Sequence, residues 1–196
     1  DPRLGFPSTE LFDRELREQI GGEYNRETID FFGHGFRVTD KRPDNLLLIG
    51  LIKQVFPKVK FIITQRNILD VAWSIFSTRF GPDLPYATKM EDILHYLKLQ
   101  DELENHWSEV FKDDIIFITY EKMIHDPKQE LTRVLDGLGE TWEDACLEFQ
   151  NLKNHVTTAS SAQVRDSLNY RSIGRSEPFL EYIENAAASL EASIVD

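Results

Sequence analysis

The sequence predicts an α/β fold, in which helices cover both faces of a parallel sheet. Three short runs, residues 36–40, 60–65 and 115–120, have the length and composition of strands. Segments with apolar residues at helical spacing separate these runs. With 196 residues, of which 41% are hydrophobic and 29% charged, the chain is expected to form one domain, residues 1–196.

Helices are expected wherever a capping residue precedes an apolar stripe. In chain order, they begin at Ser8, Asp44, Asn67, residue 89, Asp126, Thr141 and Ser176. The first is expected to stop at Gly21-Gly22, and the helix from residue 89 is expected to run to residue 112. The strongest signal is at residues 126–139, where Asp126 and Pro127 can open a helix and Gly139 can end it.

The charge is unevenly distributed along the chain. The formal net charge is -12, but residues 37–79 carry eight Lys or Arg against three Asp, so the remaining residues carry -17. An acidic protein with one basic segment is better suited to bind a small anion than to coat a nucleic acid. The alternative is a chance cluster of lysines and arginines on a solvated surface.

Other residue types exclude several classes of site. The single cysteine, Cys146, excludes an internal disulfide and a zinc site built from cysteines, and it is expected to lie in a helix with its side chain in the protein core. The five histidines show no metal-ligand spacing, so no metal is expected. Neither a membrane span nor a secretory signal is present in this sequence, which makes the cytoplasm the expected location.

Polar residues follow each of the three predicted strands. Lys41 comes after the first, Arg66 ends the second and Tyr120 ends the third. Ligands of parallel sheets bind at the carboxyl ends of the strands, so these side chains are expected to converge there. Arg66 offers a planar fork of donors for a phosphate, just before a helix whose N-H groups favour anions, and Ser74 lies two turns into that helix. Alternatively, Arg66 forms a salt bridge with Asp70, and Ser74 is a small packing residue.

Three blocks of the sequence strongly resemble one family. They are "TDKRPDNLLLIGLIKQVFPKVKFIITQRNILDVAWSIFSTRF", "IIFITYEKMIHDPKQELTRVLDGLGETWEDACLEF" and "VTTASSAQVRDSLNYRSIGR". The family is that of sulfotransferases which use 3'-phosphoadenosine 5'-phosphosulfate (PAPS), in particular the tetratricopeptide-linked bacterial and tyrosylprotein branch. The resemblance covers roughly residues 36–175 and implies a P-loop NTPase-like parallel sheet flanked by helices.

The resemblance also implies a role for individual residues. Arg66 and Ser74 would hold the 3'-phosphate of PAPS, and Tyr120 would lie beside the nucleotide. The segment that closes over the cofactor would contain Ser160, Ser161 and Gln163, and Arg175 would reach the phosphates. Lys41 and Ser160 would stabilise the transition state, with adenosine 3',5'-bisphosphate as product. Taken singly, Lys41 could be solvated, Tyr120 a core aromatic, and Ser160 and Ser161 ordinary loop residues.

The chain departs from the family pattern at its start. Members open with a strand, a Gly-rich loop for the 5'-phosphosulfate and a catalytic glutamate, and none of these is found here. Glu23 after Gly21-Gly22 has the wrong spacing to replace that glutamate. The first strand and P-loop are therefore expected to be missing from this chain. The uncovered sheet edge would favour a homo-oligomer or a partner segment.

Two functions remain open at this stage. The first is an enzyme that transfers a sulfuryl group from PAPS to a hydroxyl acceptor of unknown class. The second is a non-catalytic remnant that binds an adenosine bisphosphate or a protein partner. A P-loop kinase of small molecules is disfavoured because a Walker lysine loop is not present.

Overall fold

The computed structural model describes residues 13–80, 84–148 and 168–195. The chain divides into two compact units, one formed by residues 1–59 and 106–112 and the other by residues 60–105 and 113–196. The expectation of a single domain stays a prediction.

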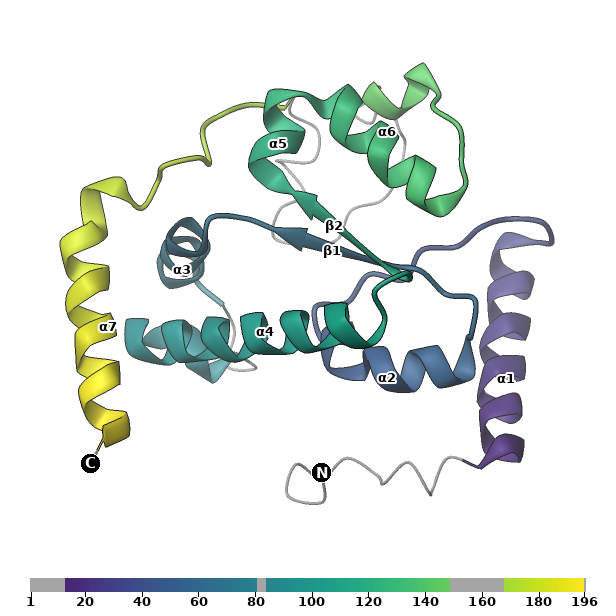
Figure 1. Cartoon of the computed structure of the whole chain (residues 1–196), viewed down its shortest axis with the longest axis horizontal. Coiled ribbons are helices and arrows are strands. Elements are labelled where there is room, and N and C mark those ends of the chain that lie inside the picture. Colours follow the sequence, from purple (N-terminus) through teal and green to yellow (C-terminus); the bar gives the residue numbers. More distant parts are fainter. Residues whose placement is uncertain (1–12, 81–83, 149–167, 196) are drawn as a thin grey trace. The chain divides into compact units, whose positions relative to one another are not determined.

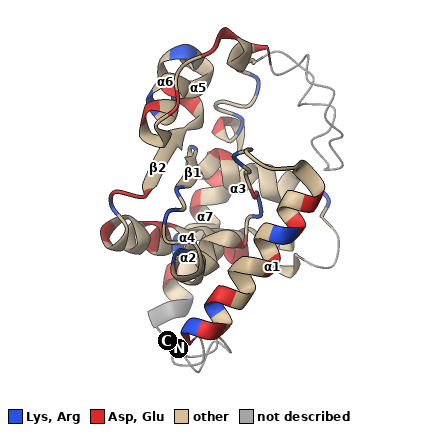
Figure 2. Ribbon diagram, turned by 90° about the vertical axis from the view of Figure 1, so that its right-hand side faces the viewer, with Lys and Arg blue, Asp and Glu red and all other residues tan. Residues whose placement is uncertain are grey.

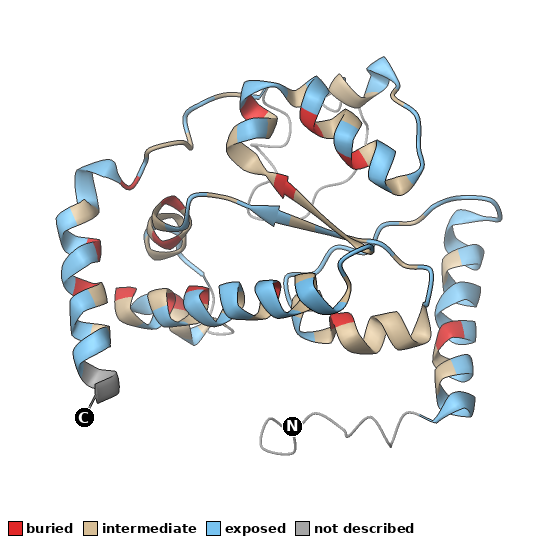
Figure 3. Cartoon of the chain, viewed as in Figure 1, coloured by how far each residue is buried: buried red, intermediate tan, exposed pale blue. Residues whose placement is uncertain are grey.

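The first unit contains two helices, α1 (Arg14–Phe32) and α2 (Asn45–Val55). α1 begins where the Asp13 side chain accepts a hydrogen bond from the Leu16 N-H at 2.8 Å. Charged residues of both signs line α1, and most of the helix is exposed (Figures 2 and 3). α2 follows Asp44 as expected, although Asp44 makes no capping hydrogen bond through its side chain.

Two expectations for this unit are wrong. α1 does not stop at Gly21-Gly22, because Gly21 is buried where Val55 of α2 approaches and the helix continues to Gly33, whose φ is 84°. Residues 36–40 form no strand. Asp40 instead accepts hydrogen bonds from Tyr24 of α1 and Asn45 of α2, each at 3.2 Å. The run pairs with neither strand of the described sheet. The Ser8 cap lies outside the described residues.

Gly50 allows a close contact between α2 and Trp107 of the same unit. The Trp107 indole donates to the Leu46 carbonyl at 2.9 Å, and a Cβ on Gly50 would lie 2.8 Å from the indole ring. We therefore expect Gly50→Ala to lower the free energy of unfolding by about 1–3 kcal/mol, because the rigid ring must move. Gly22→Ala is the matched control: its Cβ would meet nothing within 4 Å. That change should raise stability by about 0.5–1 kcal/mol. Urea unfolding measures both, and equal effects would contradict the close contact.

The second unit is built on a two-stranded parallel sheet. β1 (Phe61–Gln65) pairs with β2 (Ile115–Thr119) in the register Phe61 to Ile115 and Gln65 to Thr119. The helices of this unit are α3 (Ile68–Ser77), α4 (Met90–Val110), α5 (Tyr120–His125), α6 (Pro127–Leu138) and α7 (Leu180–Val195). The last turn of α4 belongs to the first unit. The two strands form where the sequence predicts them, and α4 matches the helix expected at residues 89–112.

Helices cover both faces of the sheet, as an α/β fold requires (Figure 1). On one face, α6 approaches β2 so closely that a Cβ on Gly137 would lie 2.8 Å from Ile116. On the other face, Glu104 of α4 accepts a hydrogen bond from Gln65 at 3.2 Å. The buried core is formed by α3, α4 and α7 through Ala72, Met90, Ile93, Leu97, Ile183 and Ala186.

The caps of α6 agree with the sequence. The Asp126 side chain accepts from the Gln129 N-H at 2.9 Å, and Gly139 ends the helix with a left-handed φ of 73°. The helix expected after Thr141 is displaced, whereas Ser176 is the N-cap of a helical segment as expected. A short 3-10 helix at Asp144–Leu147 contains Cys146, which is only half-buried, and another at Glu177–Phe179 precedes α7.

Candidate functional site

The candidate site lies where β1 passes into α3. Arg66 directly follows β1, and Asn67 caps α3 as predicted by accepting from the Leu69 and Asp70 N-H groups at 3.0 and 3.1 Å. The Asn67 N-H itself donates to the Glu121 carboxylate at 2.9 Å. These N-H groups already have protein acceptors.

Arg66 and Tyr120 meet at the carboxyl edge of the sheet. The guanidinium carbon of Arg66 lies 4.9 Å from the centre of the Tyr120 ring, a cation-π contact. β2 ends at Thr119 and Tyr120 opens α5, so the tyrosine starts a helix and does not end a strand. The expected convergence of these two strand ends is confirmed.

The guanidinium of Arg66 is only partly satisfied. Its Nη2 donates to the Ser172 carbonyl and lies 3.9 Å from the Asp70 carboxylate. The side chain is 21% exposed, and its Nε is buried without a hydrogen-bond partner among the described residues. Both expectations for Arg66 are thus partly met. It forms a long ion pair with Asp70, and its buried Nε is left to donate to another acceptor, such as an anion. Buried unpaired donors are rare and need an explanation.

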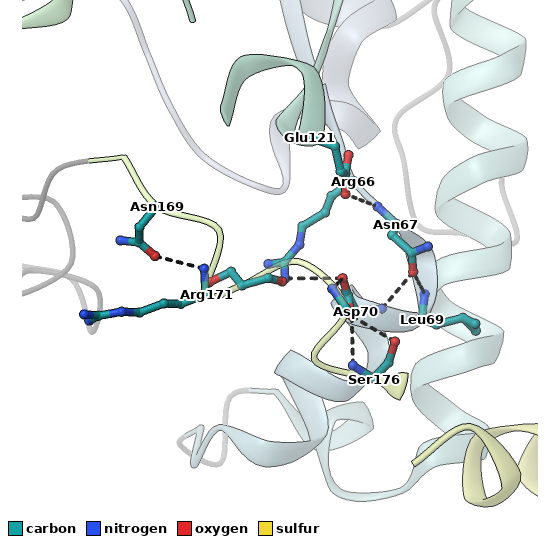
Figure 4. A network of polar contacts seen from close by, with 10 residues as sticks. Arg66, Asn67, Leu69, Asp70, Glu121, Asn169, Arg171 and Ser176 are labelled. Carbon is teal, nitrogen blue, oxygen red and sulfur yellow. Dashed lines mark hydrogen bonds and ion pairs between the residues drawn. The ribbon is translucent and has the colours of Figure 1, made fainter. Parts of the chain in front are cut away.

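Asp70 lies in the first turn of α3 and is 1% exposed. Its carboxylate accepts from the Gly174 N-H at 2.8 Å, from the Ser176 N-H at 2.9 Å and from the Ser176 hydroxyl at 2.8 Å (Figure 4). Burial by itself would raise the pKa of Asp70. The hydrogen bonds from Ser176 and Gly174, together with the charge of Arg66, outweigh burial and lower the pKa below its ordinary value.

These bonds fasten the turn at residues 172–176 to the start of α3. Gly174 has a φ of 74°, a conformation that favours glycine, and Ser176 is buried. Arg175 is exposed on this turn, three residues after the carbonyl that Arg66 contacts. The structure therefore places the turn that bears Arg175 in contact with Arg66.

Ser74 is half-buried on α3, one helical turn after Asp70 and on the same face. Its carbonyl accepts from the Thr78 hydroxyl at 2.6 Å. Because Asp70 faces Arg66 and the 172–176 turn, the position of Ser74 is compatible with the same site.

The other sequence candidates lie in the first unit or outside the described residues. Lys41 is exposed in the first unit, in a stretch without regular structure, and no strand precedes it. Lys41 was expected at the end of a strand of the sheet, and this expectation is wrong because residues 36–40 form no strand. Glu23 is exposed on α1 and accepts from Gln19 at 3.0 Å. Ser160, Ser161 and Gln163 lie outside the described residues.

Two residues of the site have roles that the sequence does not reveal. The sequence indicates Asp70 only as an ion-pair partner of Arg66 and does not indicate Glu121. The position of Asp70 in the first turn after an N-cap is a usable signal, because acidic residues are common there. Its bonds to residues 174 and 176 join segments more than a hundred residues apart, which no local pattern reveals.

The described residues contain no cluster of three or more His, Cys, Asp or Glu side chains that could hold a metal ion. Among the described helices, none combines the length and apolar composition needed to cross a membrane.

Comparison with known proteins decides the family. The sequence profile of the sulfotransferase family matches residues 9–144, more than half of the chain. The chain belongs to the sulfotransferase family. This membership implies a P-loop-like α/β fold, with which the parallel strands and flanking helices of the second unit agree.

Two relatives of this sulfotransferase family member extend the comparison. A protein-tyrosine sulfotransferase of Drosophila melanogaster is 27% identical over 150 residues, which cover 71% of this chain. An uncharacterized protein of Aquifex aeolicus (strain VF5) is 29% identical over 175 residues, 88% of this chain. The chain spans 30% of the length of the first and 23% of the length of the second.

Proposed function

We propose that this chain is the part of a PAPS-dependent sulfotransferase that holds the 3'-phosphate of the donor nucleotide. The observation that carries the proposal is the buried Nε of Arg66, which has no acceptor among the described residues. A phosphate oxygen would supply that acceptor. Membership of the sulfotransferase family supports PAPS as the nucleotide.

The residues around Arg66 fit such an anion. The Nε-H of Arg66 can donate to a phosphate oxygen, and the charges of the two groups strengthen that hydrogen bond. The face of Tyr120 covers the guanidinium at 4.9 Å and limits its hydration, which strengthens the attraction of an anion. Ser74 on the neighbouring helical turn offers a hydroxyl donor, and Arg175 a further positive charge.

When bound, PAPS supplies the sulfuryl group that is transferred to a hydroxyl of the acceptor. We propose that Lys41 and Ser160 stabilise the charge that develops on the leaving oxygen, since a cation and a hydroxyl donor suit that role. The proton of the acceptor hydroxyl needs a positioned base. The sulfuryl group is not recognised by Arg66 or Ser74, so their contacts support binding of the product adenosine 3',5'-bisphosphate equally.

The proposal is tested by isothermal titration of adenosine 3',5'-bisphosphate into the full-length protein and its Arg66→Ala variant. We expect the variant to bind about 10–100-fold more weakly, because one charge-assisted hydrogen bond is lost. Arg171→Ala is the matched control. This arginine is exposed and directly precedes Ser172, whose carbonyl accepts from Arg66, but its side chain points away from Arg66 (Figure 4). The control should change the affinity less than about twofold. An unchanged affinity in Arg66→Ala would refute the assignment.

A further inference from the structure

Asp70 has an unusual set of contacts for a carboxylate beside an anion site. It is 1% exposed and lies 3.9 Å from Nη2 of Arg66, the residue proposed to bind a phosphate. A negative charge so close would be expected to repel a second anion. However, its oxygens accept three hydrogen bonds from Gly174 and Ser176, so its charge is directed toward the turn.

These contacts give Asp70 two geometric effects. One oxygen, Oδ2, accepts from the Gly174 N-H and also faces Nη2 of Arg66, which limits the orientations of the guanidinium. The other, Oδ1, holds both the N-H and the hydroxyl of Ser176. Arg175 lies between the two residues that Asp70 holds, and the Ser172 carbonyl of the same turn accepts from Arg66.

We propose that Asp70 is a positioning residue for nucleotide recognition, which orients Arg66 and holds the turn bearing Arg175 beside it. This inference rests on the proposed function, because it concerns the same 3'-phosphate. With Nη2 held by the Ser172 carbonyl and Asp70, the buried Nε remains directed to the phosphate. Asp70 does not touch the nucleotide, and its contribution acts through Arg66 and Arg175.

The experiment compares two ligands in the full-length protein: adenosine 3',5'-bisphosphate and adenosine 5'-monophosphate, which lacks the 3'-phosphate. Titrations are made with Asp70→Asn, Arg66→Ala and the double variant. Asp70→Asn should weaken binding of the bisphosphate about tenfold and keep the affinity for the monophosphate within about twofold of the wild type. In the Arg66→Ala background, the same change should weaken binding of the bisphosphate clearly less than it does in the wild type, because only the turn bearing Arg175 is then left to be positioned.

Several outcomes would overturn the inference. Equal losses for both ligands, or full additivity with Arg66→Ala, would indicate a merely structural role. Tighter binding of the bisphosphate by Asp70→Asn would show that repulsion by the carboxylate dominates. If Asp70→Asn does not fold, as judged by circular dichroism, Ser176→Ala takes its place because it removes only one donor. Ser176→Ala should weaken binding of the bisphosphate about two- to threefold without changing the affinity for the monophosphate. Equal losses of affinity for both ligands would again count against the inference.

The same data separate this inference from the proposed function. If the unmodified protein does not bind the bisphosphate, or if Arg66→Ala binds it as well, the proposed function fails and the inference fails with it. If Arg66→Ala behaves as expected but Asp70→Asn leaves the bisphosphate affinity unchanged, only the positioning role of Asp70 fails.

Discussion

Replacing Lys41 by alanine is expected to lower kcat for sulfuryl transfer by about 10²–10³-fold. In a loose transition state, negative charge builds on the oxygen that leaves the sulfur, and the Lys41 ammonium is proposed to stabilise that charge. The interaction strengthens only as the bond breaks. Affinity for adenosine 3',5'-bisphosphate should therefore change much less than kcat does. Initial rates of transfer of labelled sulfate from PAPS by the full-length protein measure the effect.

Arg42 provides a matched control for Lys41. It is the next residue, it is also exposed and cationic, and it lies 3.6 Å from the Asp44 carboxylate. Arg42→Ala should leave kcat within about twofold, because exposed ion pairs contribute little. If the two variants lose the same activity, or if Lys41→Ala retains full kcat, Lys41 does not act on the leaving oxygen.

Replacing Glu130 by alanine is expected to lower the free energy of unfolding by about 2–3 kcal/mol at pH 7. Glu130 is buried on α6, where it accepts from the Thr119 N-H at 3.1 Å and from Arg133 at 2.7 Å. Arg133 is half exposed and can be hydrated in the variant, but the Thr119 N-H at the end of β2 would lose its acceptor. Tyr120 directly follows Thr119 and depends on the same end of β2 for its position, so the affinity for the nucleotide should also fall.

The effect of Glu130 should depend on pH. The hydrogen bond from Arg133 lowers the pKa of Glu130, and burial opposes this effect by raising it. The hydrogen bond from the Thr119 N-H and the charges of Arg133 and Lys122 lower the pKa further. A carboxyl whose pKa is lower in the folded state stabilises the protein above its unfolded pKa, about 4.3 for glutamate. This stabilisation is lost as the pH falls through the folded pKa.

Urea unfolding of the wild type and Glu130→Ala, at pH 7 and in steps below about pH 4.3, measures this dependence. The difference between the two proteins should shrink toward the acid end. Glu130→Gln, which keeps an acceptor for the Thr119 N-H, should lose about half as much stability at pH 7. A difference that is the same at every pH would show that the charge of Glu130 is not what stabilises the fold.

The parts of the fold that could be predicted from the sequence are those with local causes. The Asn67 cap of α3 and the Asp126 and Gly139 ends of α6 depend on residues within a few positions of each other. The prediction of a strand at residues 36–40 was wrong because a strand also needs a neighbouring strand to pair with, which a five-residue pattern does not encode. The stop at Gly21-Gly22 was wrong because the approach of Val55 uses the small size of Gly21 inside a helix.

The candidate site shows the same division. The contact between Arg66 and Tyr120 follows from a general property of parallel sheets, whose strands end at the same edge, so it could be predicted. The hydrogen bonds from Gly174 and Ser176 to Asp70 could not, because they depend on how a distant turn folds back on α3. Glu121 likewise reaches the Asn67 N-H only because β1 and β2 are neighbours.

The central claim is that Arg66 binds the 3'-phosphate of an adenosine nucleotide. A crystal structure of the full-length protein with adenosine 3',5'-bisphosphate tests it most directly. We predict that a 3'-phosphate oxygen lies within about 3.2 Å of Nε of Arg66, with the Ser74 hydroxyl on the same phosphate. A bound nucleotide whose 3'-phosphate lies elsewhere, with Nε of Arg66 still lacking an acceptor, would contradict the claim.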